Sequence, residues 1–325
     1  MTDAKKAVEL FQTLEVSSNI CRIGILPENA TRNRYQQILP YDHNRVILKN
    51  QNDYVNASRV TINSTTKKYI ASQGPLENTV EHFWSMIWHE DVKVIVMLTE
   101  LYDQNMKEKC HKYWEDGRKS ITCEEGSFQM QCFIIKNDNF LTIRRVFLRK
   151  FENNRLETKK ISHILFKKWS DFQTPDQEAF FCLYDEVMDG VSQKTGNNLI
   201  LIHCSAGIGR TGTFLLFDLL VNEEKDLNFG RALDLVRFLR TQRQGMAVLG
   251  RPDLNASRNE GIQKGNESKI EFRDENRPAF NKSTKPLKAK NSKGWASRDN
   301  PEANKGNQRS KSSSSNSSRH FKVNF

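Results

Sequence analysis

The chain has 325 residues, 37% of them hydrophobic, which is enough for one large domain or two small ones. No stretch approaches the roughly 18 apolar residues of a membrane-spanning helix, and the first residues lack the apolar segment of a secretory signal. The six cysteines show no CxxC spacing, which argues against a zinc site and against a disulfide framework. We therefore expect a reduced, cytoplasmic environment, with neither a metal nor a cofactor.

Strand-like and helix-like stretches alternate along the first three quarters of the chain. The strand-like runs are short, apolar and β-branched, which is typical of buried strands, and the helix-like runs have apolar residues at helical spacing. In chain order we predict a helix over 77–88, strands over 93–99 and 198–203, and helices over 212–220 and 228–243. This mixture predicts an α/β or α+β domain.

Most of the positive charge lies at the end of the sequence. Residues 251–325 hold 17 Lys and Arg against 8 Asp and Glu, so they carry +9 of the net charge of +11. This segment is rich in Lys, Asn and Ser, and it has too few apolar residues to offset its chain entropy by burial. We predict one domain over residues 5–250 and a disordered basic tail over 251–325.

A glycine-containing loop lies between the last predicted strand and the helix that follows it. It reads HCSAGIGRTG over residues 203–212. Gly207 and Gly209 permit a tight curl that turns backbone N–H groups inward, and such a nest at a helix N-terminus binds anions. Arg210 can add a bidentate guanidinium suited to phosphate, and the same positive field favours a thiolate at Cys204. The loop therefore predicts a cysteine nucleophile facing a bound phosphate.

Each part of this loop has a plainer explanation when taken alone. A single cysteine is most often a small core residue, and a glycine-rich turn between strand and helix also occurs in nucleotide sites. However, the nucleotide-binding patterns G-x-x-x-x-G-K-[ST] and G-x-G-x-x-G are both missing here. The combination of His, Cys, two loop glycines and Arg therefore favours the phosphate-binding loop.

Residues 5–248 resemble the classical protein tyrosine phosphatase family, of which HCSAGIGRTG is the signature. Further segments resemble family motifs in the same order: NRY at 33–35, LPYDH at 39–43, DYVNAS at 53–58, SQGP at 72–75, KC at 109–110, YW at 113–114 and LR-x-QR-x-GM at 239–246. The resemblance implies a single phosphatase domain in which helices flank a central, mixed, twisted sheet. It also implies a substrate that is a phosphotyrosine-containing protein.

The resemblance assigns roles to the residues of the loop. Cys204 would attack phosphorus and become phosphocysteine. His203 would help to lower the pKa of the thiol, and Thr211 would ease departure of the thiolate. The phosphate would be held by the residues that follow the cysteine: Ser205, Ala206, Gly207, Ile208, Gly209 and Arg210.

Three residues outside the loop complete the implied site. The segment WSDF at 169–172 resembles the family's acid loop, so Asp171 would protonate the leaving tyrosine oxygen and then activate water. Tyr35 resembles the aromatic wall of the substrate pocket, and Lys109 a lysine that contacts the acid loop or the phosphate. The plainer alternatives are a solvated loop carboxylate, a half-buried core tyrosine and a surface lysine.

The chain departs from the family pattern at four positions and at its end. Gln37 replaces an Asn or Asp that positions the substrate backbone, and Gln104 replaces a Glu that braces the loop arginine. Ser170 replaces the proline of the acid loop, which should loosen that loop. Val248 replaces a glutamine that orients the hydrolytic water, and the final aromatic helix is missing. We expect these changes to slow hydrolysis of the phosphoenzyme more than its formation.

Two other functions remain open. The first is a phosphatase-like module that binds or traps phosphotyrosine proteins and turns over poorly. The second places the function in the basic tail, although this tail lacks the aromatic residues and folded motif of a specific nucleic-acid site, and we expect at most weak contact with anionic surfaces. The altered loops and divergent end resemble the phosphatases that polydnaviruses of parasitoid wasps carry. That resemblance implies an effector that counters tyrosine-kinase signalling in the cytoplasm of a host cell.

Overall fold

The structure is a computed structural model that describes residues 20–49, 52–62, 67–123, 126–152, 154–170, 173–192, 198–222 and 229–247. All of these lie within one compact unit, Met1–Ile262. The predicted tail over 251–325 lies outside the described residues. None of the helices in the described part is long and apolar enough to cross a membrane.

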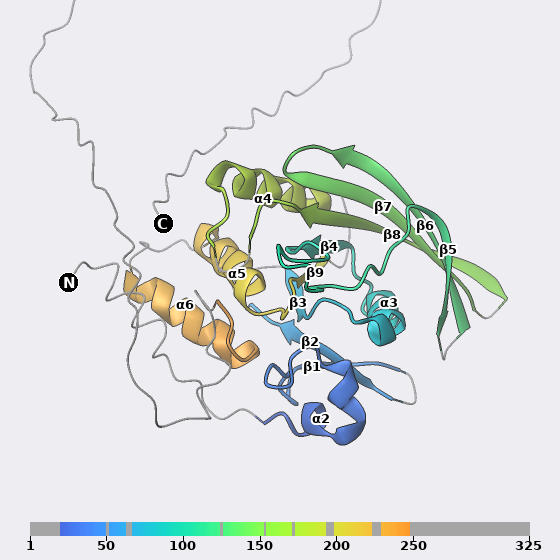
Figure 1. Cartoon of the computed structure of the whole chain (residues 1–325), viewed down its shortest axis with the longest axis horizontal. Helices are drawn as coiled ribbons and strands as arrows, with labels where there is room; N and C mark the ends of the chain where they lie inside the picture. Colours follow the sequence, from blue (N-terminus) through green and yellow to red (C-terminus); the bar gives the residue numbers. More distant parts are fainter. Residues whose placement is uncertain are drawn as a thin grey trace, which may run out of the picture. The chain divides into compact units, whose positions relative to one another are not determined.

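A mixed sheet forms the centre of this unit, as predicted (Figure 1). Its described strands follow the order β1-β2-β3-β9-β4-β8-β7-β6-β5. Strand β9 pairs in parallel with β3 and β4, β4 pairs in parallel with β8, and the remaining neighbours are antiparallel. The strand bounds are β1 Arg45–Ile47, β2 Tyr54–Val60, β3 Lys68–Ser72, β4 Val94–Met97, β5 Gly117–Cys123, β6 Gly126–Asn137, β7 Leu141–Glu152, β8 Arg155–Phe166 and β9 Leu199–His203.

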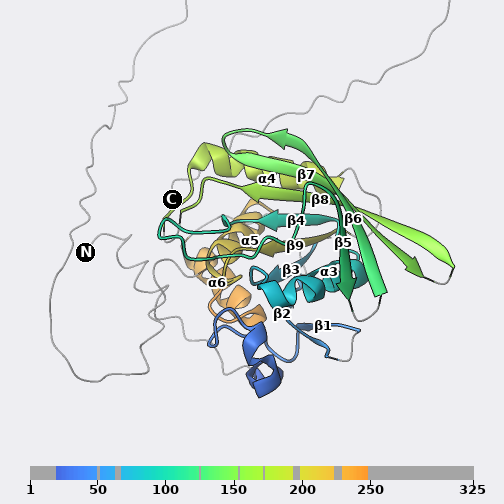
Figure 2. The ribbon, with the colours of Figure 1, turned by 45° about the vertical axis from the view of Figure 1, so that its right-hand side comes forward.

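Strands β4 and β9 are buried on both faces, which explains why their sequences are continuously apolar. In β9, Leu199 and Leu201 belong to one hydrophobic core, and Ile200 and Ile202 belong to the other. The sheet therefore separates two cores, and helices lie over both of its faces (Figures 1 and 2). The strands predicted over 93–99 and 198–203 are confirmed, although β4 ends at Met97.

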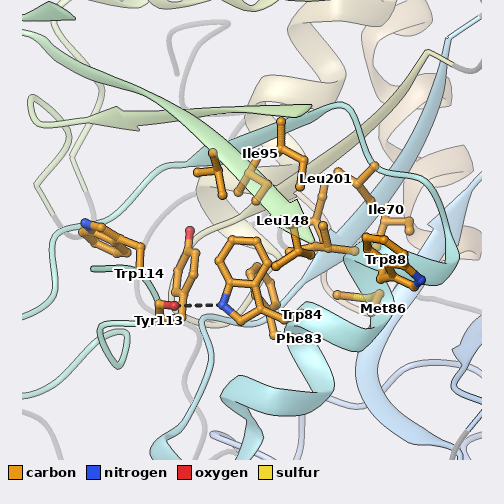
Figure 3. Close-up of a cluster of buried hydrophobic side chains, with 14 of the residues drawn as sticks. Ile70, Phe83, Trp84, Met86, Trp88, Ile95, Tyr113, Trp114, Leu148 and Leu201 are labelled. Carbon is orange, nitrogen blue, oxygen red and sulfur yellow. Dashed lines mark hydrogen bonds between the residues drawn. The ribbon is translucent and has the colours of Figure 1, made fainter. Parts of the chain in front are cut away.

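One core lies between the sheet and helix α3 (Val80–His89). The helix predicted over 77–88 is confirmed, but it begins with a 3₁₀ turn, η2 (Glu77–Thr79), before α3. Figure 3 shows Phe83 and Trp84 of α3 beside Tyr113, with the indole Nε1 of Trp84 donating to the carbonyl of Tyr113 at 2.8 Å. This contact holds the segment after residue 109 against α3.

The opposite core is covered by the helices α4 (Gln177–Ser192), α5 (Gly209–Val221) and α6 (Phe229–Gln242). The predictions for α5 and α6 are confirmed, although α5 begins three residues before the predicted Gly212. The short helix α2 (Arg22–Ile25) and the 3₁₀ helix η1 (Pro27–Arg32) precede β1. No prediction covered these two helices, α4 or the long strands β5 to β8.

A buried carboxylate on α5 ties this helix to the sheet. Asp218 is fully buried and accepts a hydrogen bond from the hydroxyl of Tyr184 at 2.8 Å and one from the hydroxyl of Tyr69. The ammonium of Lys67 lies 2.5 Å from the same carboxylate. Three elements therefore meet at one charge, and a buried carboxylate is stable only when it is paired in this way.

We expect Asp218→Asn to lower the free energy of unfolding by about 2–3 kcal/mol, since Lys67 loses its buried counter-charge and two hydroxyls compete for one amide oxygen. Urea denaturation measures the change. Asp234→Asn is the matched control, because Asp234 is exposed on α6 and pairs only with Arg237 in the described part. This substitution should change the free energy of unfolding by no more than about 1 kcal/mol. Equal effects of the two substitutions would contradict this anchoring role.

Candidate active site

The loop that contains Cys204 lies at the edge of the sheet where three parallel strands end. Strands β3, β9 and β4 run in parallel, so Gln73, Leu98 and Cys204, which follow them, come to the same edge. The loop then leads into α5, as the sequence predicts. Crevices at the carboxyl ends of parallel strands are the usual binding sites of such sheets.

The backbone of this loop curls around the sulfur of Cys204. The N–H of Gly207 points to Cys204 Sγ at 3.2 Å, and Cys204 itself is only 5% exposed. Gly207 has a φ of 71°, and a Cβ atom at this position would lie 2.2 Å from the carbonyl oxygen of Ser72. Only glycine fits this close approach, so the curl predicted from the sequence has a steric cause.

Arg210 extends from the first turn of α5 back toward the end of β4. Its Nη1 donates to the carbonyl of Leu98 at 2.8 Å. Burial lowers the pKa of Arg210 to about 10, while the nearby Tyr35 and Glu100 act in the opposite direction, so the guanidinium is charged at neutral pH. The structure therefore places the positive charge of Arg210 beside the loop.

His203 contacts the backbone of Cys204. A carbonyl oxygen can only accept, so His203 Nδ1 donates to the carbonyl of Cys204 at 3.1 Å. Burial lowers the pKa of His203 to about 4, so the ring is neutral at neutral pH and its Nε2 must accept. The hydroxyl of Tyr113 donates to Nε2 of His203 at 2.8 Å. The same hydroxyl accepts a hydrogen bond from Nε2 of His163, also at 2.8 Å. A neutral His203 contributes orientation to the loop, not positive charge.

Tyr35 reaches the loop from the segment after η1. Its hydroxyl lies 3.0 Å from Ser205 Oγ. The two residues before Tyr35 fix the backbone of this segment. The side-chain amide of Asn33 donates to the carbonyl of Gly24, and the guanidinium of Arg34 donates to the carbonyl of Pro75 at 2.6 Å. Tyr35 is therefore presented to the loop by a rigid segment, and Gln37 is exposed two residues later.

Lys109 has a carboxylate partner that the family resemblance did not imply. Its Nζ lies 3.1 Å from the carboxylate of Asp103, whereas Gln104 is exposed. Backbone N–H donation by Lys107, together with Lys109 and a second N–H, lowers the pKa of Asp103 below its usual range. Asp103, the residue before Gln104, therefore pairs with Lys109.

Arg243 supports the loop from behind, and sequence reasoning assigned it no role. It is fully buried, although it carries a guanidinium. Its nitrogens donate to the carbonyls of Gly207 at 3.0 Å and Ala206 at 3.2 Å, and to the side chains of Ser58 at 3.1 Å and Asn56 at 2.6 Å. The loop is therefore tied both to the residue that follows α6 and to β2.

The end of the described chain also packs on the loop. The N–H of Ala247 donates to the carbonyl of Ile208 at 3.1 Å, and a Cβ atom at Gly212 would lie 2.1 Å from the nitrogen of Ala247. Thr211 is fully buried, and its hydroxyl has no hydrogen-bond partner in the part of the chain that the structure describes. Val248 itself lies outside the described residues.

The predicted acid Asp171 also lies outside the described residues, so only the flanks of its loop are visible. Trp169 is buried against Phe166 and Phe180, and its Nε1 donates to the carbonyl of Gln173 at 2.8 Å. Ser170 is exposed. The tryptophan before Asp171 is therefore anchored in the core. Of the predicted site residues, the structure brings together the loop from His203 to Arg210 with Tyr35.

Comparison with known proteins agrees with this geometry. The family model described as protein-tyrosine phosphatase matches residues 29–248. The human tyrosine-protein phosphatase non-receptor type 2 is 37% identical over 238 residues, which is 71% of this chain and 55% of that protein. The mouse tyrosine-protein phosphatase non-receptor type 7 is 35% identical, and the match covers 68% of this chain and 60% of that protein. The human tyrosine-protein phosphatase non-receptor type 13 is also 35% identical, and the match covers 74% of this chain and 10% of that protein.

The chain thus spans about half the length of the first of these relatives. The matched region includes every strand of the described sheet and the loop around Cys204. Because the family model covers more than half of the sequence, the chain belongs to the protein-tyrosine phosphatase family.

Proposed function

We propose that this protein hydrolyses phosphotyrosine in proteins through a phosphocysteine intermediate on Cys204. The observation that carries the proposal is the N–H of Gly207 aimed at Cys204 Sγ, inside a loop beside the charged Arg210. Inward N–H groups and a guanidinium suit a phosphate dianion, and an electropositive setting favours the thiolate. The family membership supports the same activity.

The proposed reaction has two steps. Cys204 Sγ attacks phosphorus, an S–P bond forms, the bond from phosphorus to the tyrosine oxygen breaks, and Asp171 gives its proton to that oxygen. Water then attacks phosphorus, Asp171 takes a proton from the water, and the S–P bond breaks to release inorganic phosphate and the thiolate. Ser205 to Arg210 hold the phosphate in both steps, and Thr211 assists departure of the thiolate.

Substrate selection follows from the position of Tyr35. Its hydroxyl reaches Ser205, so its ring stands beside the mouth of the loop. We propose that this ring stacks on the phosphotyrosine ring and sets a depth that phosphoserine cannot span. Lys109, held by Asp103, is proposed to contact the acid loop or the phosphate when substrate binds.

A module that traps phosphotyrosine proteins is the second candidate, and two positions favour it. Ser170 removes the proline restriction from the acid loop, and Val248 directly follows Ala247, which packs on Ile208. A valine side chain cannot hydrogen-bond to the hydrolytic water. Slow hydrolysis of the phosphoenzyme would leave substrate bound to the protein.

Val248→Gln is expected to raise the steady-state turnover of an aryl phosphate by roughly tenfold, because a positioned amide can orient the attacking water. Rapid mixing measures both the initial burst and the later steady rate. The wild-type protein should show a burst of about one product per molecule and then a slow phase, and the substitution should raise only the slow phase. Multiple fast turnovers by the wild type would exclude trapping, and phosphopeptide binding without a burst would exclude the enzyme.

Other predictions remain untested by the structure. These are the cytoplasmic location, the weak contact of the basic tail with anionic surfaces and the origin in a virus that acts on host signalling. Deleting residues 251–325 should leave the kinetics toward an aryl phosphate unchanged, as a solvated tail requires.

A further inference from the structure

The antiparallel strands β5 to β8 have one face in the core and one face outside it. Inward positions such as Met130, Val146 and Ile161 belong to the core beneath α3. The opposite positions define the basic–aromatic face. They are Arg118 on β5, Phe133 on β6, Arg145, Phe147, Arg149 and Phe151 on β7, and Leu156 and Lys160 on β8.

Strand register places these residues in rows across the sheet. Arg118 pairs with Gln131, Gln131 with Phe147, and Phe147 with Lys160, so cations and an aromatic ring share one row. The same register places no Asp or Glu among the outward positions of the described parts of β6, β7 and β8. The face therefore has one sign of charge.

The cations of this face have no acidic partner among the described residues. The side chain of Arg149 donates to the amide oxygen of Gln131 at 3.2 Å, which leaves its charge uncompensated. By contrast, inward-facing Arg144 pairs with Asp116, and Lys136 at the far end of β6 pairs with Glu186 of α4. Arg144 and Lys136 therefore have acidic partners, whereas the cations on the face have none among the described residues.

Two apolar residues of the face lie exposed at one end of the β7–β8 hairpin. Phe151 and Leu156 are cross-strand partners beside the β7–β8 turn and are 68% and 60% exposed. Phe133 is 45% exposed and packs edge-on against Phe147. In Figures 1 and 2 this end of the β7–β8 hairpin projects away from α4. Apolar tips flanked by cations are typical of surfaces that enter the headgroup region of a bilayer.

Charge excludes two of the possible occupants. The segment 251–325 carries a net charge of +9, and a second copy of the chain would present the same cations, so both would be repelled. A single-stranded nucleic acid needs a row of free rings for successive base stacking, but Phe147 is partly covered by Phe133, and the exposed ring of Phe151 has Leu156, which offers no ring, as its cross-strand partner. The exposed Phe and Leu side chains at the projecting end of the hairpin, together with the Arg and Lys residues of the face, fit an anionic lipid surface better than they fit any of these three partners.

We propose that the basic–aromatic face of β5 to β8 binds anionic membranes, with Phe151 and Leu156 entering the headgroup region while Arg145, Arg149 and Lys160 contact lipid phosphates and carboxylates. This binding is peripheral and independent of the loop around Cys204. It would concentrate the domain at phosphorylated proteins of a membrane surface.

Co-sedimentation of the full chain with vesicles tests the proposal. Phosphatidylcholine vesicles with phosphatidylserine are compared with pure phosphatidylcholine vesicles. We expect binding only to the anionic vesicles, and we expect Arg145→Gln with Arg149→Gln to weaken it by roughly tenfold or more. Phe151→Ser with Leu156→Ser should weaken it by a similar factor, and this loss should persist in low salt.

The control separates this face from the general charge of the chain and of its tail. Lys49→Gln with Lys68→Gln removes the same charge from exposed positions elsewhere and should bind vesicles like the wild type. Unchanged melting temperatures show that each variant is folded. The proposal is overturned if the Arg145→Gln, Arg149→Gln variant binds vesicles as well as the Lys49→Gln, Lys68→Gln variant does. It is also overturned if the variants of the basic–aromatic face lose binding to a single-stranded oligonucleotide while their binding to vesicles is unaffected.

Discussion

Cys204→Ser is expected to lower the turnover of an aryl phosphate on the order of 10⁵-fold or more, as removal of a covalent nucleophile does in other enzymes. Serine keeps the shape of the side chain but does not ionise near neutral pH, so no S–P bond forms. The N–H of Gly207 and the charge of Arg210 do not depend on sulfur. Binding of a phosphotyrosine peptide, measured by calorimetry, should therefore remain.

The matched control is Cys182→Ser, because Cys182 is a half-buried free thiol on α4, outside the loop of residues 203–212. It should keep activity close to that of the wild type. Activity that survives Cys204→Ser would contradict the covalent mechanism. Loss of peptide binding together with activity would show that the thiolate, and not the loop backbone, holds the substrate.

Arg243→Met has the second-largest expected effect, and it acts on stability and activity together. The guanidinium donates to two loop carbonyls and to the side chains of Asn56 and Ser58, and burial lowers its pKa to about 10, so it is charged. Methionine fills similar space but leaves these buried acceptors unpaired. We expect the free energy of unfolding to fall by about 3–5 kcal/mol, and the melting temperature by about 10 °C.

The loop should also lose its fixed geometry, so turnover should fall by roughly 100-fold even where the variant is folded. Arg237→Met is the control on α6, the helix that directly precedes Arg243, since Arg237 is exposed and pairs with Asp234 at 2.8 Å. Its effect on stability should stay within about 1 kcal/mol. If Arg243→Met is folded and fully active, Arg243 does not position the loop.

The parts of the fold that the sequence predicts are those with an unambiguous pattern. The run over 198–203 is apolar without alternation, and β9 is indeed buried on both faces. The helix after the loop is longer than predicted because Gly209 and Arg210 begin it without any apolar residue. The long strands β6 to β8 escaped prediction because charged and aromatic residues alternate on their outer face, and this pattern is also typical of a solvated segment.

The candidate site also has some features that the sequence predicts and others that it does not. The loop chemistry is local, so residues 203–212 reveal it directly. The role of Arg243 depends on Asn56, which lies 187 positions away, and a single sequence carries no sign of that contact. The placement of Asp103 beside Lys109 depends on the turn between them, in which Met106 has a φ of 59°, and the sequence gives no sign of this backbone conformation.

The position of β9 has a consequence for how the chain reaches its working form during synthesis. Its neighbours β3 and β4 are synthesised more than a hundred residues earlier. One edge of each strand therefore stays unpaired until β9 leaves the ribosome. The loop is then completed only by Arg243 and Ala247. Folding should thus be slow, and a nascent chain that stalls before residue 247 should aggregate and lack any phosphatase activity.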